Sequence, residues 1–147
     1  LFGTTVSSPV FGVEVPVLPH PAAEKDKGAG IAMCCTFGDT TDIDWWRDLQ
    51  LPLRAILRKD GRLEMQTPAW ITDARGREVY AAMAGKTAFT ARAILVEALT
   101  VGGEMRGEPV KTVRQTNFYE RGDKPLEIVT SRQWYIRNGG RPWTRPA

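Results

Sequence analysis

The chain has 147 residues, of which 42% are hydrophobic and 25% charged, a balance typical of one soluble globular domain. The formal net charge of +3 permits contact with a phosphate backbone but does not require it. No apolar run reaches the roughly 18 residues of a membrane helix, and Leu1 to Val6 lack the charged start of a signal peptide, so we expect a cytoplasmic protein without a membrane partner.

The first third of the chain predicts strands. Residues 11–18 alternate apolar and other side chains, which is typical of a half-buried strand. Pro16 within them favours an edge position or a bulge, because proline cannot donate to the ladder. A polar loop is expected over residues 19–27. The apolar run from Gly30 to Cys35 then predicts a short buried strand.

The only cysteines, Cys34 and Cys35, are adjacent at the end of this run. Their Cα atoms lie about 3.8 Å apart across a trans peptide, below the range of about 4.4–6.8 Å that is usual for a disulfide. Unpaired cysteines favour a reducing compartment, which agrees with the expected cytoplasmic location.

A helix is predicted after Asp39. Acidic and hydroxyl side chains at residues 39–42 supply N-cap groups and negative charge for the positive end of a helix. Ile43 and Trp46 then recur at helical spacing. Pro52 ends the pattern, because proline cannot continue a helix.

The middle of the chain predicts a hairpin and two helices. Residues 54–58 and 63–65 form two strands joined by a turn at residues 59–62, where Asp-Gly is a strong hairpin signal. A short helix is expected over residues 78–84, and the strongest helical pattern covers residues 87–101. This pattern carries an apolar stripe at i, i+3, i+4, i+7 and i+8, made by Ala91, Ile94, Leu95, Ala98 and Leu99.

Three further strand candidates follow, at residues 110–114, 126–130 and 133–136. The glycine- and proline-rich residues 138–147 predict a flexible tail or linker that need not be native. Together these patterns predict a β-rich α+β domain over residues 1–137 with peripheral helices.

Several common sites are excluded by their spacing. Residues 85–87 end like a phosphate-binding loop, but the position of its first glycine holds Tyr80. The third glycine of a dinucleotide motif is replaced by Met33. Two adjacent cysteines and one histidine cannot form a structural zinc site. His20 stands between two prolines in an expected surface loop, which favours a solvated side chain over a catalytic one.

One cluster remains, from Gly28 to Asp42. It combines glycines, an expected buried strand and two carboxylates, Asp39 and Asp42, at a helix start. Either the carboxylates cap the helix, or one of them holds a cation, since three-residue spacing puts both on one helix face. The residues alone leave both interpretations open.

This cluster resembles the editing-domain motif of valyl-, isoleucyl- and leucyl-tRNA synthetases, in which two glycines, a short strand and two acids three residues apart follow one another. Gly28 and Gly30 match the glycines, and Asp39 and Asp42 match the acids. Residues 117–137 are similar to the segment of bacterial valyl enzymes that leads from the editing domain back to the catalytic core. This second match favours the valyl over the isoleucyl branch.

The resemblance implies a fold, a closed and roughly six-stranded barrel with peripheral helices. It assigns residues 1–137 to an editing domain that is incomplete at its N-terminus, because the Thr-Thr-Arg-Pro stretch that forms one pocket wall in the family is not found here. Whether the segment is active without that stretch stays open.

The resemblance also implies a function, the hydrolysis of mischarged threonyl-tRNA(Val) by an aminoacyl-tRNA deacylase site within a valine–tRNA ligase. Valyl enzymes are a known example of poor discrimination, because an apolar synthetic site rejects threonine only about a hundredfold. The implied partner is the acceptor end of tRNA(Val), with the threonyl group as substrate, and the protein is expected to be monomeric. No cofactor is implied for the editing domain, since ATP and Mg belong to the catalytic core of the parent enzyme.

By the same resemblance, Asp42 would hold the α-ammonium group of the attached amino acid, and Asp39 could help to recognise the threonine hydroxyl. Water would attack the ester, placed by protein groups and the terminal ribose, with no protein nucleophile and no metal.

Gly28, Gly30, Met33 and Cys35 would contribute to the substrate site together with the two acids. Met33 and Cys35 stand where many relatives carry lysine and threonine, and residues 36–38 replace their Pro-Ala-His. The resemblance therefore implies a less polar pocket than the common version.

Two alternatives remain at the level of the sequence. One is a non-catalytic barrel that binds nucleic acid or protein, for which Arg132 beside Trp134 and Tyr135 would fit base stacking, although a solvated strand face explains them equally. The other is the equivalent domain of an isoleucyl-tRNA synthetase.

Overall fold

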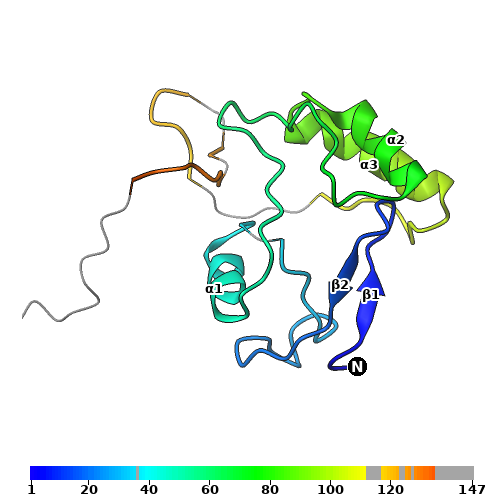
Figure 1. Ribbon diagram of the computed structural model, residues 1–147, viewed down its shortest axis with the longest axis vertical. Coiled ribbons are helices and arrows are strands. Elements are labelled where there is room, and N and C mark those ends of the chain that lie inside the picture. Colours follow the sequence, from blue (N-terminus) through cyan, green and yellow to red (C-terminus); the bar gives the residue numbers. More distant parts are fainter. Residues whose placement is uncertain (36, 112–116, 123–124, 127, 135–147) are drawn as a thin grey trace, which may run out of the picture.

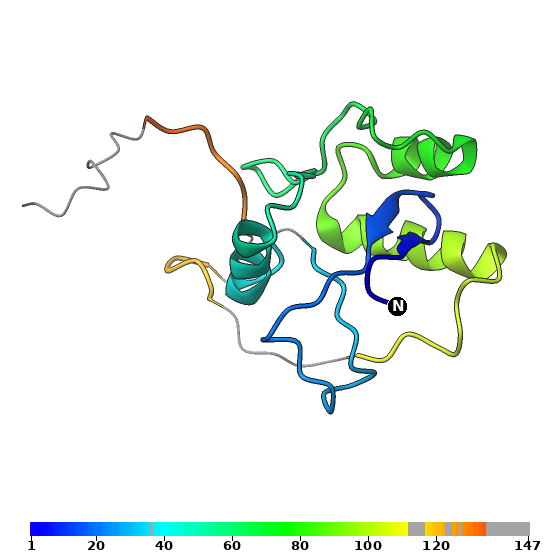
Figure 2. The same ribbon diagram turned by 60° about the horizontal axis from the view of Figure 1, so that its bottom comes forward.

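A computed structural model describes residues 1–35, 37–111, 117–122, 125–126 and 128–134. The elements of this described part are the strands β1 (Thr5–Ser7) and β2 (Glu14–Pro16) and the helices α1 (Thr40–Asp48), α2 (Ala74–Met83) and α3 (Ala88–Val101). Helices α2 and α3 pack against each other, with the β1–β2 hairpin beside them (Figure 1). Helix α1 stands apart from this group in both views (Figure 1, Figure 2).

Strands β1 and β2 form an antiparallel pair in which Thr5 lies opposite Pro16 and Ser7 opposite Glu14. Both strands of a two-stranded sheet are edges, so the predicted edge position of Pro16 is confirmed. The loop between them is closed by the Ser8 N–H, which donates to the Val13 carbonyl at 2.8 Å. These backbone groups of the hairpin therefore find their hydrogen-bond partners within the hairpin itself.

Each helix begins at a side-chain cap. Asp39, Asp73 and Thr87 each accept a hydrogen bond from the backbone N–H three residues further on, which satisfies one free donor of the first turn. Helices α1 and α3 confirm two of the sequence predictions. Helix α2 begins earlier than the predicted residues 78–84, because its cap lies at Asp73.

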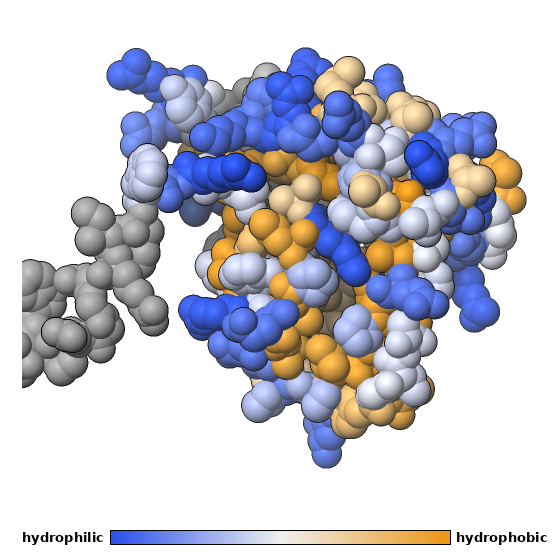
Figure 3. Space-filling model, in the orientation of Figure 1, coloured by the Kyte–Doolittle hydropathy of each residue, from blue (hydrophilic) through white to orange (hydrophobic). Residues whose placement is uncertain are grey.

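The hydrophobic core lies where the hairpin, α2 and α3 meet. Its buried side chains are Val13, Leu63, Ile71, Tyr80, Met83 and Ala91. Ile94 and Leu95 of α3 pack against this cluster, as the apolar stripe predicts. Helix α1 contributes no side chain to the core, and its one buried residue is Asp42. The space-filling view shows apolar side chains also reaching the surface across the middle of this face (Figure 3).

Glu104 joins three distant parts of this packed unit. Its Oε1 accepts a hydrogen bond from the Val10 N–H at 3.0 Å, and its Oε2 accepts one from Arg75 Nη2 at 2.8 Å. The same Arg75 nitrogen donates to the Ala98 carbonyl of α3 at 2.6 Å. Val10 is held at a φ of 64°, a left-handed conformation that is rare for a β-branched residue.

The predicted closed barrel of six strands is wrong. The described residues contain one open two-stranded sheet and three helices, and no barrel is found among them. The expected buried strand over residues 30–35 is not formed, and Ile31 and Met33 are 68% and 75% exposed. A barrel requires every strand to pair along both of its edges, and this segment pairs along neither.

The predicted hairpin over residues 54–65 is reduced to one isolated bridge between Leu57 and Leu63. Leu63 is buried against α2 and α3, so its apolar character is satisfied by helix packing and not by an extended ladder. The strand candidates at residues 110–114, 126–130 and 133–136 form no strand where they are described. Their remaining residues, and the predicted tail at 138–147, lie outside the described residues. None of the helices described has the length and apolarity to cross a membrane.

Candidate functional site

The two candidate carboxylates meet at the start of α1 with different roles. Asp39 is the N-cap, and its Oδ1 accepts the backbone N–H of Asp42 at 2.9 Å. Asp42 lies in the first turn and is only 9% exposed. Its carboxylate makes no hydrogen bond or ion pair with any described residue. Capping is therefore the role of Asp39, and the carboxylate of Asp42 takes no part in it.

The carboxylate of Asp42 lies against Gly38. A Cβ atom at position 38 would overlap with Asp42 Oδ2, so no larger residue fits there without moving the acid. On the other side, the Cys34 thiol donates to the Asp42 backbone carbonyl at 3.6 Å. Cys34 and Gly38, at the end of the glycine-rich segment, thus both contact Asp42 in the first turn of α1.

Cys35 lies close to both acids. Partial burial raises the pKa of its thiol, and the negative charges of Asp42 and Asp39 raise that pKa further, because they oppose a second anion nearby. The thiol therefore stays protonated near neutral pH, and a protonated thiol is a poor nucleophile. Cys35 adds a weakly polar wall to the site.

A cavity of about 300 Å³ opens beside Cys35 and Gly38, and we call it the first cavity. Its other lining residues are Phe37, Arg54, Ala55, Ile56, Leu57, Ile128, Val129 and Thr130. The Phe37 ring meets Trp46 of α1 edge-on, with ring centroids 5.3 Å apart, so this wall is anchored on the helix that carries Asp42. The volume suits a small organic group.

The structure brings together Cys35, Asp39 and Asp42 but not the other predicted site residues. Gly28 and Gly30 lie in a loop with φ values of 60° and 70°, and neither they nor Met33 line the first cavity. At Gly30 a Cβ atom would lie 2.8 Å from the Lys25 carbonyl oxygen. This glycine is required by the turn of the loop itself.

Sequence reasoning missed two walls of the first cavity, residues 54–57 and 128–130. Both segments were predicted only as parts of strands from their apolar residues, and a search for titratable side chains overlooks such residues. Arg54 is their one charged member, and its guanidinium carbon lies 5.9 Å from the centroid of the Trp70 ring. Within the described residues, no group of three or more histidine, cysteine or acidic side chains is placed to hold a metal ion.

Comparison with known proteins gives close relatives, although no protein-family model matches the chain. The chain is 68% identical over 141 residues to a valine–tRNA ligase of Cutibacterium acnes, a match that covers 96% of this chain. It is 66% identical over 139 residues to the valine–tRNA ligase of Bifidobacterium longum, covering 95% of this chain. For the Thermobifida fusca valine–tRNA ligase the identity is 58% over 141 residues, again 96% of this chain. The chain spans 16% of the length of the first and third relatives and 15% of the second.

Proposed function

Because this chain belongs, as one segment, to the valine–tRNA ligase family, we propose that it carries the editing site that hydrolyses mischarged threonyl-tRNA(Val). The family confirms the valyl resemblance and speaks against the isoleucyl alternative. In this proposal the full-length protein is a valine–tRNA ligase, and the acceptor end of tRNA(Val) is the partner of this segment.

One observation carries the proposal: Asp42 is only 9% exposed, and its carboxylate, which has no partner among the described residues, lies against Gly38 in the wall of the first cavity. A carboxylate that is partly shielded from water and has no cation beside it favours a cationic ligand group nearby. The α-ammonium group of an aminoacyl ester supplies such a cation. We infer that the aminoacyl group enters the first cavity with its ammonium directed to Asp42.

The reaction needs positioning more than a reactive side chain. A water oxygen attacks the ester carbonyl carbon, the bond to the ribose oxygen breaks, and that oxygen leaves with a proton, which gives free threonine and uncharged tRNA. The protonated Cys35 thiol takes no part as a nucleophile. Asp39 uses Oδ1 to cap α1, and we propose its second oxygen as the acceptor for the threonine hydroxyl.

The test replaces Asp42 in the full-length enzyme. Asp42→Asn removes the charge while the size and the Asp39 cap are kept, so the stability of α1 should change little. Loss of a hydrogen bond between charged groups costs about 1.5–3 kcal/mol, and we expect deacylation of threonyl-tRNA(Val) to slow about 10- to 150-fold. Valine activation should remain near normal.

Asp44→Asn is the matched control, because Asp44 lies in the same helix but is exposed and paired with Arg47 at 2.7 Å. It should deacylate like the parent enzyme. An Asp42→Asn enzyme that edits at the parental rate would show that this carboxylate does not bind substrate. Binding of tRNA without any hydrolysis by the parent would favour a non-catalytic module.

A further inference from the structure

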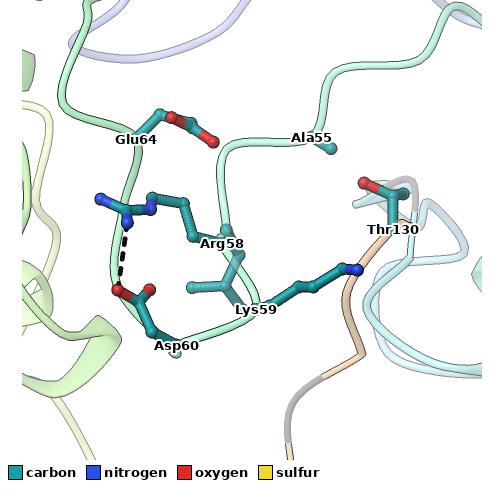
Figure 4. A pocket seen from close by; sticks show the side chains of 7 residues that line it. Ala55, Arg58, Lys59, Asp60, Glu64 and Thr130 are labelled. Atoms are coloured by element: carbon teal, nitrogen blue, oxygen red, sulfur yellow. Dashed lines mark ion pairs between the residues drawn. The ribbon is translucent and has the colours of Figure 1, made fainter. Parts of the chain in front are cut away.

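A second cavity of about 390 Å³ adjoins the first. The two cavities share three lining residues, Ala55, Leu57 and Thr130. The remaining walls of the second cavity come from the loop after residue 57, with Arg58, Lys59 and Asp60, and from Glu64 (Figure 4). A ligand in the first cavity can therefore continue into the second.

The charges around the second cavity are only partly paired. Arg58 and Asp60 form an ion pair with Nη2 3.3 Å from Oδ2, which compensates both. Lys59 and Glu64 have no ion pair with any described residue. Figure 4 shows the Lys59 ammonium directed towards Thr130, with Glu64 across the cavity. One wall thus offers a free cation and a hydroxyl, and the opposite wall offers a free carboxylate.

This arrangement matches the chemistry of a nucleotide better than that of a simple anion. A phosphate oxygen pairs with an ammonium and accepts a hydrogen bond from a hydroxyl. A ribose hydroxyl donates to a carboxylate, whereas a carboxylate repels a free anion. The two walls therefore fit the phosphate and the sugar of one nucleotide.

The loop that carries Lys59 is held in place before any ligand arrives. The Arg58 N–H donates to the Arg62 carbonyl at 2.8 Å, and Asp60 Oδ1 accepts the Arg62 N–H at 3.2 Å. Leu63, which follows directly, is buried in the core at 4% exposure. A preformed loop loses little conformational entropy on binding.

We propose that the second cavity holds the nucleotide that precedes the terminal, aminoacylated nucleotide of the acceptor strand. Lys59 and Thr130 contact its phosphate, and Glu64 accepts a hydrogen bond from its ribose. This inference rests on the proposed function, because it is the ester in the first cavity that brings the neighbouring nucleotide to the shared wall.

The experiment compares two substrates in the full-length enzyme, threonyl-tRNA(Val) and the threonyl ester of adenosine alone, which lacks the preceding nucleotide. Lys59→Ala and Glu64→Gln should each lower kcat/KM about tenfold on the tRNA substrate, mainly through KM. On the adenosine ester both variants should match the parent. Lys59→Ala should also reduce the slope of log(kcat/KM) against log[salt] by about 1, the loss of one phosphate contact.

Lys86→Ala and Glu97→Gln are matched controls, since both residues are exposed and line neither cavity. They should leave both substrates and the salt slope unchanged. Equal losses on both substrates with an unchanged salt slope would mean a structural role and overturn the inference. Parental kinetics on the tRNA substrate would overturn it while the proposed function stands.

Free adenosine monophosphate separates the two possible sources of the nucleotide. If adenosine monophosphate does not inhibit deacylation of threonyl-tRNA(Val), even at concentrations that saturate ordinary nucleotide sites, the result supports the tRNA strand as the source of the nucleotide. Competitive inhibition that Lys59→Ala relieves would assign the cavity to a free nucleotide and overturn the inference. A parent enzyme that hydrolyses neither substrate would remove the proposed function, and this inference with it.

Discussion

The reactivity of the Cys35 thiol depends on the charge at the candidate site, because nearby acids raise its pKa. Burial is the larger cause of its raised pKa, and the negative charge of Asp42 is the next. Asp42→Asn removes one of these charges, so the thiol pKa should fall towards its ordinary value and more thiolate should be present at a given pH. We expect iodoacetamide to alkylate Cys35 faster in this variant at pH 8.

Peptide mapping by mass spectrometry separates Cys35 from the adjacent Cys34. Asp44→Asn serves again as control, because Asp44 does not contribute to the pKa of Cys35. Identical alkylation rates in the parent and Asp42→Asn would mean that the acid and the thiol are farther apart than the structure shows. This measurement tests the geometry of the site independently of its activity.

The residues of the site illustrate what the sequence can and cannot predict. Asp39 and Asp42 were found from their spacing at a helix start, and two roles stayed open for them. The hydrogen bond from Asp42 to Asp39 Oδ1 assigns capping to one acid, and spacing alone cannot make that assignment. The wall residues 54–57 and 128–130 could not be predicted, because their place beside Cys35, Phe37 and Gly38 depends on how distant segments fold together.

Helix α2 contains a buried glycine whose replacement reverses the usual rule. By helix propensity alone, Gly76→Ala should stabilise α2 by about 1 kcal/mol. A Cβ atom there would lie 2.9 Å from the Cα of Phe11 and 3.1 Å from Ile71 Cγ2, and backbone cannot yield cheaply. We therefore expect destabilisation by about 1–3 kcal/mol, the usual cost of overpacking, measured as faster amide hydrogen exchange in α2 of the full-length protein.

Ala81→Gly is the companion variant, because Ala81 is exposed on the same helix. It should also destabilise, by about 1 kcal/mol, as propensity predicts. If Gly76→Ala slowed exchange in α2, the contact between the hairpin loop and this helix would be wrong. If Gly76→Ala and Ala81→Gly both destabilise α2, although one substitution is the reverse of the other, packing outweighs helix propensity at position 76.

At the scale of elements, helices were predicted better than strands. The acidic and hydroxyl side chains at residues 39–42 and the apolar stripe on α3 are local signals, and they were sufficient to predict α1 and α3. Strand formation depends on partners far away in the sequence, and an alternating pattern also fits residues that are buried singly, as Leu63 is. The early start of α2 was missed because Gly76 weakens the helical pattern of its first turn.

The candidate site lies at the edge of the core, because Ile56 and Leu57 both line the first cavity and pack against the core cluster. The buried cluster lies among the hairpin, α2 and α3, whereas Asp42 and the first cavity belong to α1 and to irregular segments. The family could be inferred from short motifs, because a motif preserves a local pattern of residues. The barrel was inferred from the same resemblance, and the described residues do not form it.

Glu104 links the parts of this core, so its charge state should affect the stability of the whole unit. The Val10 N–H and Arg75 hold its pKa below the ordinary value of 4.5. A carboxyl group with a lowered folded-state pKa stabilises the fold above its unfolded pKa, and this contribution is lost as the pH falls through the folded pKa. Glu104→Gln should therefore lower the unfolding temperature at pH 7 and have progressively less effect below about pH 4.5.

Thermal unfolding of the full-length protein across this pH range checks the prediction, with hydrogen exchange at the hairpin and α2 as a local measure. Glu97→Gln, on the exposed face of α3, should show no such trend. A Glu104→Gln effect that is the same at pH 3 and pH 7 would mean that the side chain acts through packing and not through its charge.

The hydrogen bond between Val10 and Glu104 spans 94 positions of the chain, and this has a consequence for biosynthesis. A ribosome makes the chain from its N-terminus, so the hairpin and α2 are complete before residue 104 has been translated. The strained Val10 conformation has no carboxylate to receive its N–H during that interval. Core packing can already place the hairpin against α2, but the bond from Val10 to Glu104 forms only after the residues that follow α3 have been made. This makes the bond a late event in every round of translation.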